Sequence, residues 1–432
     1  MSGQTETDEG GCLVVHCLRD PTRQALFRLD QISIYAHVEM SNGFVVFTCG
    51  PEAGDSLEVW RWAEDQDVYP LDCSPTESQR HLYKNATIGP GYGSSRRGVL
   101  VPMGILKHPD LTRASRLVYP TMCVGNQSGD SLFLWDIRTR KLTQTIEIEP
   151  SPYVRFRMNY VDVNETHVFV ATHTVSVYSR ATRQRVFYLD ESHLAQITTH
   201  ISSPTPLPSH GSVFTRRELS GYNTTDRPMI SGHLPWDVIM AVHVSPDGDS
   251  FVAITFQGHM FHMNGLKSRA TESGNDAVGR SRAHLRISAT QVQSCLENLA
   301  YDGQRILAYG DMGLCLLNLE VSTQDHFAVS FGDGVAGELY PFPAKILNFM
   351  YPFGGMGQYG DCSCLQLTRD ACWVAWMAQS HQGRWHDLFG SNRKTVGVID
   401  FTREMMASIS LDALNASVLI VTNVVARKFD YE

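Results

Sequence analysis

Several groups of residues in this chain have side chains that bind metals or cofactors in other proteins. Cys362 and Cys364 are separated by a single residue, Cys372 lies beyond them, and His381 and His386 follow. Structural zinc sites place two to four residues between paired cysteines and close with a second pair. Residues i and i+2 of a strand share one face. We therefore interpret Cys362 and Cys364 as packing residues between sheets and predict no metal site.

A glycine pattern resembles a nucleotide-binding motif. Gly332-Asp-Gly334-Val-Ala-Gly337 spells G-x-G-x-x-G, which binds a pyrophosphate where the loop opens a helix. Here Pro341 and Pro343 follow and oppose a helix. We predict a glycine-rich loop and no cofactor. The sequence has no Gly-x-Ser-x-Gly, His-Glu-x-x-His or phosphate-binding loop. We therefore predict that the protein is not an enzyme and has no catalytic residues.

Two segments have the composition of partner-binding loops. Residues 267–286 hold Lys267, Arg280 and Arg282 among few apolar neighbours; such a run is most often a solvated loop, and it also suits an acidic peptide or a phosphate. Residues 340–353 are aromatic and apolar and cannot stay bare in water without risking association. This segment either docks on the protein itself or contacts a partner. Its candidate contact residues are Tyr340, Phe342, Phe349, Tyr351 and Phe353.

Composition limits the classes of partner. The chain has 432 residues, 43% of them hydrophobic, and a formal net charge of -9. This charge argues against nucleic acid or a membrane surface as a partner. Residues 1–11 have no basic patch and no apolar run, so we expect a disordered tail, no secretory signal, and a cytoplasmic or nuclear location.

Cysteine usage and glycosylation motifs agree with that location. The 10 cysteines are scattered, mostly within apolar runs, and we expect small buried side chains. Asn-x-Ser/Thr sequons occur at Asn85, Asn126, Asn164, Asn223 and Asn415. Without a secretory signal these positions would not meet the glycosylation machinery.

The clearest structural pattern lies in residues 232–264. Residues 238–244 alternate apolar with small or polar side chains, Ser245-Pro246-Asp247-Gly248 is a tight turn, and residues 251–256 form a second apolar run. Proline presets φ at such a turn and glycine accepts the positive φ. A third strand is expected over 259–264. The segment resembles a blade of a WD-repeat protein, with Gly232-His233 at the family's Gly-His position and Ser-Pro-Asp-Gly at its usual turn.

Weakened copies of the family's Trp-Asp ending recur along the chain. Ser131-Leu-Phe-Leu-Trp135-Asp136 is the best match. Others end residues 56–61, 174–179, 259–264, 313–318 and 395–400. An apolar strand is expected before each copy, at 44–48, 121–125, 167–172, 251–256, 305–310 and 372–378. A sandwich would also suit short strands with turn signals, but the four-strand period favours a propeller.

The resemblance implies an all-β fold, a seven-bladed WD-repeat-like β-propeller with long insertions, or alternatively eight blades. A blade takes about 40 to 45 residues, so seven leave roughly 130 residues for insertions, including 65–116 and 332–361. We predict one domain over residues 12–432, closed by pairing of the N- and C-terminal strands. In this family a buried polar set joins a loop His, a Ser or Thr of the second strand, an Asp before the third strand, and the Trp. In the 232–264 blade only His233 and Thr255 match it.

The function implied by the resemblance is a non-catalytic scaffold that binds other proteins. One alternative is the substrate-recruiting propeller of an F-box-type ubiquitin ligase receptor, because the pattern resembles propeller domains of fungal F-box/WD-type proteins. Another alternative is a propeller enzyme whose site lies on the central axis, where polar side chains of several blades converge.

Overall fold

The fold is described from a computed structural model of the chain. The structure describes residues 11–17, 26–32, 37–48, 56–65, 74–88, 98–149, 158–189, 214–218, 238–256, 258–266, 285–291, 296–310, 313–319, 327–330, 336–340, 344–349, 362–367, 371–378, 393–400, 405–410 and 418–422. The chain divides into two compact units. Unit 1 comprises Met1–Glu149, Ser380–Arg393 and Leu411–Glu432, and unit 2 comprises Pro150–Gln379 and Lys394–Ser410. Each unit is described by itself.

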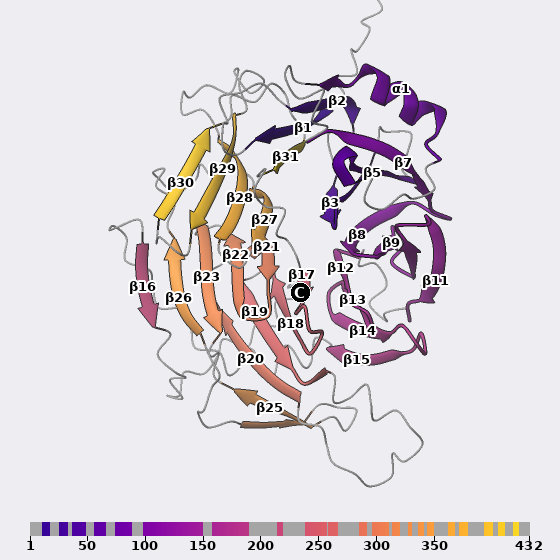
Figure 1. The fold of residues 1–432 in the computed structure, drawn as a ribbon. Helices are drawn as coiled ribbons and strands as arrows, with labels where there is room; N and C mark the ends of the chain where they lie inside the picture. Colours follow the sequence, from indigo (N-terminus) through magenta and orange to yellow (C-terminus); the bar gives the residue numbers. More distant parts are fainter. Residues whose placement is uncertain are drawn as a thin grey trace, which may run out of the picture. The chain divides into compact units, whose positions relative to one another are not determined.

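Unit 1 contains four-stranded sheets (Figure 1). Two of them have their strands in chain order, each antiparallel to the next. These are β3 (Val38–Ser41), β4 (Phe44–Phe47), β5 (Ser56–Trp62) and β7 (Leu100–Lys107), then β8 (Thr112–Val118), β9 (Thr121–Asn126), β10 (Ser131–Asp136) and β11 (Lys141–Glu147). The remaining sheet has the order β31 (Val418–Thr422), β1 (Gly11–Cys17), β2 (Phe27–Ile32) and β6 (Thr87–Ile88).

Unit 2 repeats the same arrangement. One sheet is β12 (Tyr160–Val163), β13 (His167–Ala171), β14 (Val175–Ser179) and β15 (Arg185–Leu189). Two more begin with β17 (Ile239–Val244), β18 (Ser250–Thr255), β19 (His259–Asn264) and β20 (Leu285–Gln291), and with β21 (Leu296–Tyr301), β22 (Arg305–Gly310) and β23 (Gly313–Leu319). A further sheet is β27 (Cys362–Leu367), β28 (Ala371–Ala378), β29 (Arg393–Asp400) and β30 (Met405–Ser410).

The hydrophobic core lies between successive sheets. In unit 2, Phe169 and Phe187 of the β12–β15 sheet pack on Phe251 of the next sheet, with ring centroids 5.5 and 6.1 Å apart. A second cluster joins the β17–β20 sheet to β21–β23, and a cluster in unit 1 joins β4, β5 and β7 to β8, β9 and β10. Burying one large apolar side chain contributes roughly 1.5–3 kcal/mol. Second strands such as β4, β9, β13 and β18 are therefore buried along their whole length.

This arrangement confirms the predicted fold class, an all-β propeller of four-stranded antiparallel blades. The apolar strands expected before each Trp-Asp-like ending are β4, β9, β13, β18, β22 and β28. The turn after β17 also has the expected geometry, with Gly248 at φ 75° and its N–H bonded to the Ser245 carbonyl at 2.8 Å. The described residues form seven sheets. The blade count of the whole chain, seven or eight, and the single domain over 12–432 stay predictions.

The strands from the two ends of the sequence lie side by side in unit 1. β31 pairs with β1 in parallel, from Leu13 with Val418 to Cys17 with Thr422 (Figure 1). β1 pairs on its other side with β2, antiparallel. Both edges of β1 are therefore hydrogen-bonded, and the edge of β2 receives the short strand β6.

The predicted insertion over residues 65–116 is not simply a loop. It follows the 3-10 turn η1 (Ala63–Asp65) and contains helix α1 (Glu77–Asn85), the fourth strand β7, and the strand β8 that opens the next sheet. Thr76 and Gln79 form a capping box: the Thr76 side chain accepts the Gln79 N–H, and Gln79 Oε1 accepts the Thr76 N–H, each at 3.1 Å. Among the described residues, no helix is long and apolar enough to cross a membrane.

The predicted insertion over residues 332–361 also supplies strands. β25 (Ala336–Tyr340) lies parallel to β20 and extends the β17–β20 sheet, and β24 (Phe327–Ser330), which precedes the insertion, pairs with the other side of β25. β26 (Ala344–Phe349) becomes the fourth strand of the β21–β23 sheet and pairs on its far side with β16 (Phe214–Glu218). A strand therefore follows the G-x-G-x-x-G pattern, where a nucleotide-binding loop needs a helix.

Candidate functional site

The predicted partner-binding residues lie partly in strands. Tyr340 ends β25, with its Cα opposite that of Ser288 in β20. Phe349 ends β26, with its Cα opposite Phe214 on one side and Leu314 on the other. The other candidates lie outside the described residues: Phe342, Tyr351, Phe353, Lys267, Arg280 and Arg282. Their binding role stays a prediction.

Other sequence candidates can be placed in the same way. Cys362 and Cys364 lie in β27, and a register shift between them interrupts regular pairing with β28. Cys12, Cys123 and Cys315 are buried free thiols, as predicted for small packing residues. Within the described ranges, no group of three or more His, Cys, Asp or Glu side chains could hold a metal ion. Residues 232–237, which include His233, lie outside the described part of the chain.

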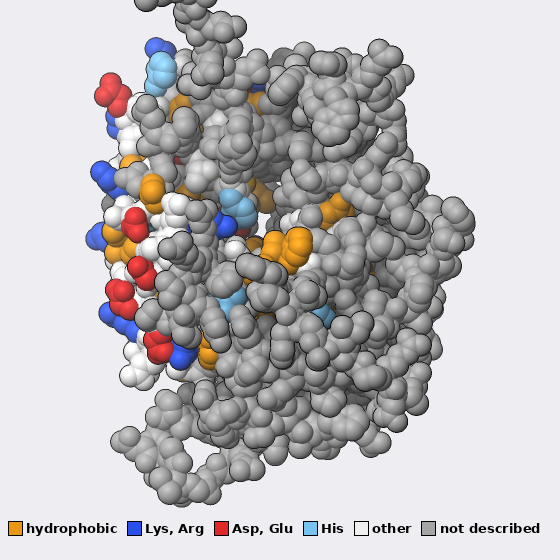
Figure 2. Space-filling model, turned by 180° about the vertical axis from the view of Figure 1, so that it is seen from behind, with side chains coloured by type: hydrophobic (Ala, Val, Ile, Leu, Met, Phe, Trp, Pro, Cys, Tyr) orange, Lys and Arg blue, Asp and Glu red, His pale blue; other side chains and the backbone are white. Residues whose placement is uncertain are grey.

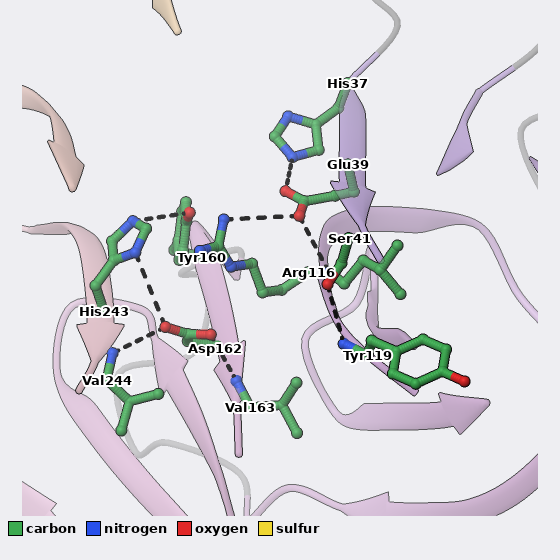
Figure 3. A network of polar contacts seen from close by, with 11 residues as sticks. His37, Glu39, Ser41, Arg116, Tyr119, Tyr160, Asp162, Val163, His243 and Val244 are labelled. Atoms are coloured by element: carbon green, nitrogen blue, oxygen red, sulfur yellow. Dashed lines mark hydrogen bonds and ion pairs between the residues drawn. The ribbon is translucent and has the colours of Figure 1, made fainter. Parts of the chain in front are cut away.

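A polar cluster joins the first strands of two successive sheets in unit 1 (Figure 3). Glu39 of β3 is buried, and its Oε2 accepts the backbone N–H of Leu117 in β8 at 3.1 Å. Arg116 Nη1 lies 3.6 Å from the same oxygen, and His37 Nε2 lies 2.7 Å from Oε1. Ser41 Oγ accepts the N–H of Tyr119 at 3.3 Å. One buried carboxylate thus bonds both a cationic side chain and a backbone amide of the next sheet.

The charges in this cluster shift each other's titration. Burial alone would raise the pKa of the Glu39 carboxyl, but the Arg116 charge, the His37 contact and the Leu117 N–H outweigh it and lower that pKa. Desolvation lowers the pKa of His37, but the hydrogen bond to Glu39 and the charge of Glu39 together outweigh it, so the pKa of His37 is raised. The carboxylate is therefore held in its charged form.

Unit 2 contains a second cluster of the same design. Asp162 of β12 is buried, and its Oδ2 accepts the N–H of Val244 in β17 at 2.8 Å while its Oδ1 accepts the N–H of Val163 at 2.8 Å. His243 Nδ1 lies 3.9 Å from Oδ2, and His243 Nε2 lies 3.0 Å from the Tyr160 hydroxyl. We call each arrangement a carboxylate clasp: Glu39 with Arg116 and the Leu117 amide, and Asp162 with His243 and the Val244 amide (Figure 3).

The clasp residues occupy one register position. Each is the first-strand residue whose Cα lies opposite the third residue of its second strand. In chain order the pairs are Glu39 with Val46, Arg116 with Cys123, Asp162 with Phe169 and His243 with Val252. Acid and base alternate, and Ala300 and Gln366 then stand at this position in β21 and β27.

The clasps provide hydrogen-bond acceptors for backbone amides on the outer edge of a first strand. One edge of such a strand pairs with the second strand, and the amides on its other edge need another acceptor, since a buried unpaired N–H is costly. Glu39 and Asp162 supply that acceptor from the preceding sheet. Both carboxylates are occupied by backbone and cationic partners, so the geometry joins strands rather than activating a nucleophile or water.

A third polar cluster lies within the β8–β11 sheet. Asn126 is buried; its Oδ1 accepts the N–H groups of Gly129, Asp130 and Ser131 at 3.0–3.1 Å, and its Nδ2 lies 2.6 Å from Asp130 Oδ1. The hydrogen bond from Asn126 is the main cause of the lowered pKa of Asp130. The His108 ring packs edge-on against Trp135, with centroids 5.3 Å apart. Loop His, Asp before the third strand, and Trp are three members of the WD-repeat polar set.

The fold is a divergent WD-repeat-like propeller. Its strand order, its face-to-face packing and this polar set carry the assignment. No family model matches the chain, and no curated protein does either. Among solved structures the chain is similar to the beta-propeller domain of Cps50 (Swd1) from Myceliophteria thermophila, with 8% identity and a TM-score of 0.46 over 88% of this chain and 86% of that chain. A chain of the mitotic checkpoint complex gives 8% identity and a TM-score of 0.45, over 98% and 89%.

Unit 1 of the propeller also exposes apolar side chains near its clasp. Met40 of β3, Val118 of β8 and the adjoining Tyr119 are 40%, 36% and 38% exposed. The Ser41–Tyr119 hydrogen bond holds the two strand ends together, and the Tyr119 ring stacks on Phe44 with centroids 5.9 Å apart. We call Met40, Val118 and Tyr119 the strand-end patch. The face shown in Figure 2 has charged side chains of both signs, and separate groups of hydrophobic side chains lie among them.

Unit 2 also contains a cluster of buried hydroxyl groups. The Tyr301 hydroxyl lies 2.7 Å from Ser250 Oγ and 3.2 Å from His262 Nε2. Burial lowers the pKa of His262 to about 4 and raises the pKa of Tyr301. A neutral imidazole in this position serves packing and hydrogen bonding between β21 and the preceding sheet.

Proposed function

We propose that this propeller is a non-catalytic scaffold for protein–protein interactions. The strand-end patch carries the proposal, because Met40, Val118 and Tyr119 expose apolar and aromatic surface on strand ends fixed by hydrogen bonds and ring stacking. Tyrosine is enriched among the few residues that supply most of the binding energy at protein interfaces, and methionine adapts its shape to different partners. The occupied carboxylates of Glu39 and Asp162 support a structural role for the polar first strands.

The predicted contact residues of the insertions belong to the same proposal. Tyr340, Phe342, Phe349, Tyr351, Phe353, Lys267, Arg280 and Arg282 are proposed as further partner contacts. The proposed partners are other proteins, and the net charge of -9 supports neither nucleic acid nor an anionic membrane. We propose a cytoplasmic or nuclear location, which imaging of the tagged full chain tests.

Cross-linking combined with affinity purification tests the scaffold. A double variant, Met40→Ser with Val118→Ser, should lose stable partners and their cross-links while keeping the wild-type melting temperature. The matched control is Leu142→Ser with Val186→Ser, because these side chains are 41% and 39% exposed on outer strands β11 and β15. Equal recovery of partners by the two double variants would remove the strand-end patch from the proposal.

Two narrower functions remain as alternatives within the same experiment. A substrate-recruiting role in an F-box-type ubiquitin ligase predicts that the cross-linked partners include ligase core subunits. A propeller enzyme predicts turnover that depends on a first-strand carboxylate, and an unchanged rate in Glu39→Gln and Asp162→Asn would argue against it.

A further inference from the structure

We propose that the two carboxylate clasps are acid-sensitive latches between successive first strands. While Glu39 and Asp162 are charged, each holds the first strand of the next sheet; on protonation the strands part, and each sheet keeps its own pairing. The inference is independent of the proposed scaffold role, because it concerns how neighbouring sheets are joined within each unit.

The hydrogen bonds within each sheet do not depend on the clasps. β3 pairs with β4 from Val38–Phe47 to Ser41–Phe44, and β12 pairs with β13 from Tyr160–Ala171 to Val163–Val168. These ladders use the edge of the first strand that faces away from the clasp. Loss of a clasp therefore frees the opposite edge and leaves the ladder in place, which is a local opening rather than global unfolding.

At the Val244 end of β17, the clasp residues make the polar contacts with β12: Asp162 with the Val244 amide, and His243 with Asp162 and the Tyr160 hydroxyl. At the other end, Ile239 is held separately, because its carbonyl accepts Asn159 Nδ2 at 2.9 Å and its N–H donates to the Thr172 carbonyl at 3.1 Å. The opening is therefore expected at the Val244 end. A buried carboxylate that bonds a backbone amide and a cation loses both strong interactions when it is protonated. The hydrogen bond of the remaining neutral acid is weaker, and the amide becomes the point of opening.

Few other charged or titratable side chains lie on the strands around Glu39. The clasp cation Arg116 comes from β8, which also carries Arg113, and His37 precedes β3. Strand β4, with sequence FVVF, has no titratable side chain. Protonation of Glu39 would leave the Arg116 guanidinium, 30% exposed, without this counterion. That cost opposes protonation and agrees with the lowered pKa of Glu39.

Asp162 has a different set of neighbours. His243 is the only titratable side chain of β17, and Tyr160 lies on the strand of Asp162 itself. The paired strand β13 carries His167, whose imidazole Nδ1 lies 2.9 Å from Thr166 Oγ1 and whose pKa burial lowers. Strand β21 packs against β17 and carries Glu297 and Tyr301. The partner of Asp162 is an imidazole, which is charged only when protonated, whereas the partner of Glu39 is the permanently charged Arg116.

Hydrogen exchange of the full chain, measured by mass spectrometry, tests the latches. Between about pH 7 and about pH 3, which passes below the lowered pKa of Glu39, peptides that contain the Leu117 and Val244 amides should lose protection by roughly tenfold or more after correction for intrinsic rates. Peptides from β9 and β13 should keep theirs. In Glu39→Gln the Leu117 amide should exchange rapidly already at neutral pH, and in Asp162→Asn the Val244 amide should do so. Neither variant should change exchange in the other unit.

Asp302→Asn is the matched control. Asp302 binds Arg305 at 2.6 Å within a single turn, so its charge joins no two sheets, and its variant should leave the Leu117 and Val244 amides protected. The proposal is wrong if Glu39→Gln and Asp162→Asn keep the wild-type pH dependence. It is also wrong if β9 and β13 lose protection together with the first strands, because the carboxylates would then hold the whole fold.

Discussion

At the residue scale, Asn126 links three backbone amides. Its buried side-chain oxygen accepts the N–H groups of Gly129, Asp130 and Ser131 in a turn that is partly exposed. We expect Asn126→Ala to lower the free energy of unfolding by about 2 kcal/mol, because three amides lose their protein acceptor at once. Urea denaturation measures this loss. Ser128→Ala removes the 2.7 Å bond from Asn126 and the Ser128 contact with Asp130 on an exposed part of the turn, and it should cost under about 1 kcal/mol; equal losses would show that Asn126 has no special role.

The Glu39 clasp gives the molecule a defined pH dependence. The pKa of His37 is raised from 6.5, so its contribution to stability is complete below that value and disappears as pH rises through the folded-state pKa. The pKa of Glu39 is lowered from 4.5, so its contribution is complete above that value and disappears as pH falls through the folded-state pKa. The clasp should therefore stabilise most between these two pH values.

The variant His37→Gln tests both sides of that window. It should remove the decline in stability that the wild type shows as pH rises above 6.5, and it should move the acid-side loss of stability to higher pH, because the His37 contact helps to lower the pKa of Glu39. Melting temperatures of both proteins across the pH range measure this. The effect will be small, because the His37 side chain is 56% exposed and water screens its charge. If the melting temperatures of the wild type and of His37→Gln changed with pH in parallel, His37 would not be the group that causes the decline above 6.5.

Residue-scale predictions from the sequence succeeded where a turn is local. Ser245, Asp247 and Gly248 make the expected turn, with Ser245 Oγ 2.5 Å from Asp247 Oδ1. The sequence did not predict the carboxylate clasps, because the hydrogen bond between Asp162 and the Val244 amide joins residues 82 positions apart. Asn126 was noted in the sequence only as part of a sequon, although Asn126-Gln-Ser-Gly-Asp130 is also a turn signal.

At the element scale, helix α1 depends on one buried amide. Gln79 Nε2 donates to the Gly104 carbonyl at 2.8 Å and also to Glu58 Oε2, which ties the helix to β7 and β5. We expect Gln79→Ala to cost roughly 2–4 kcal/mol, because it removes a buried donor from the Gly104 carbonyl and from Glu58 Oε2, which keeps the Trp60 indole N–H as a partner at 3.3 Å. Thr76→Ala, which removes only the cap, should cost about 1 kcal/mol. Chemical denaturation ranks the two, and a smaller loss for Gln79→Ala would overturn this account of the helix.

Elements were predictable where the apolar pattern continued without interruption. The second strands are buried on both faces, so β4, β9 and β18 appear as apolar runs in the sequence. Helix α1 was missed although Thr76-Glu-Ser-Gln79 is a capping-box pattern. β26 could not be assigned from sequence, because its partner β23 ends 25 residues before it begins, at Leu319 against Ala344. A β-ladder partner at that distance is chosen by tertiary packing rather than local propensity.

At the scale of the whole molecule, the sequence predicts the repeated sheet but not its exceptions. Four-stranded blades follow from the Trp-Asp-like endings, whereas the parallel pairing of β20 with β25 has no sequence signature. The expected pairing between strands from the two ends of the sequence is visible in the β31–β1 ladder. Because a strand with an open edge invites association with other chains, this ladder should matter for solubility as well as stability.

A pair of proline variants tests the contribution of that ladder. Ile420 lies in the middle of β31, opposite Val15, and Val418 is its first residue, opposite Leu13. Ile420→Pro should cost about 3 kcal/mol or more and promote association, because proline removes a donor and distorts the strand beside β1. Val418→Pro should be far milder, since proline is tolerated at the first position of a strand. Thermal unfolding with size-exclusion chromatography measures both; equal behaviour of the two variants would mean that β31 contributes little to holding the N-terminal strand.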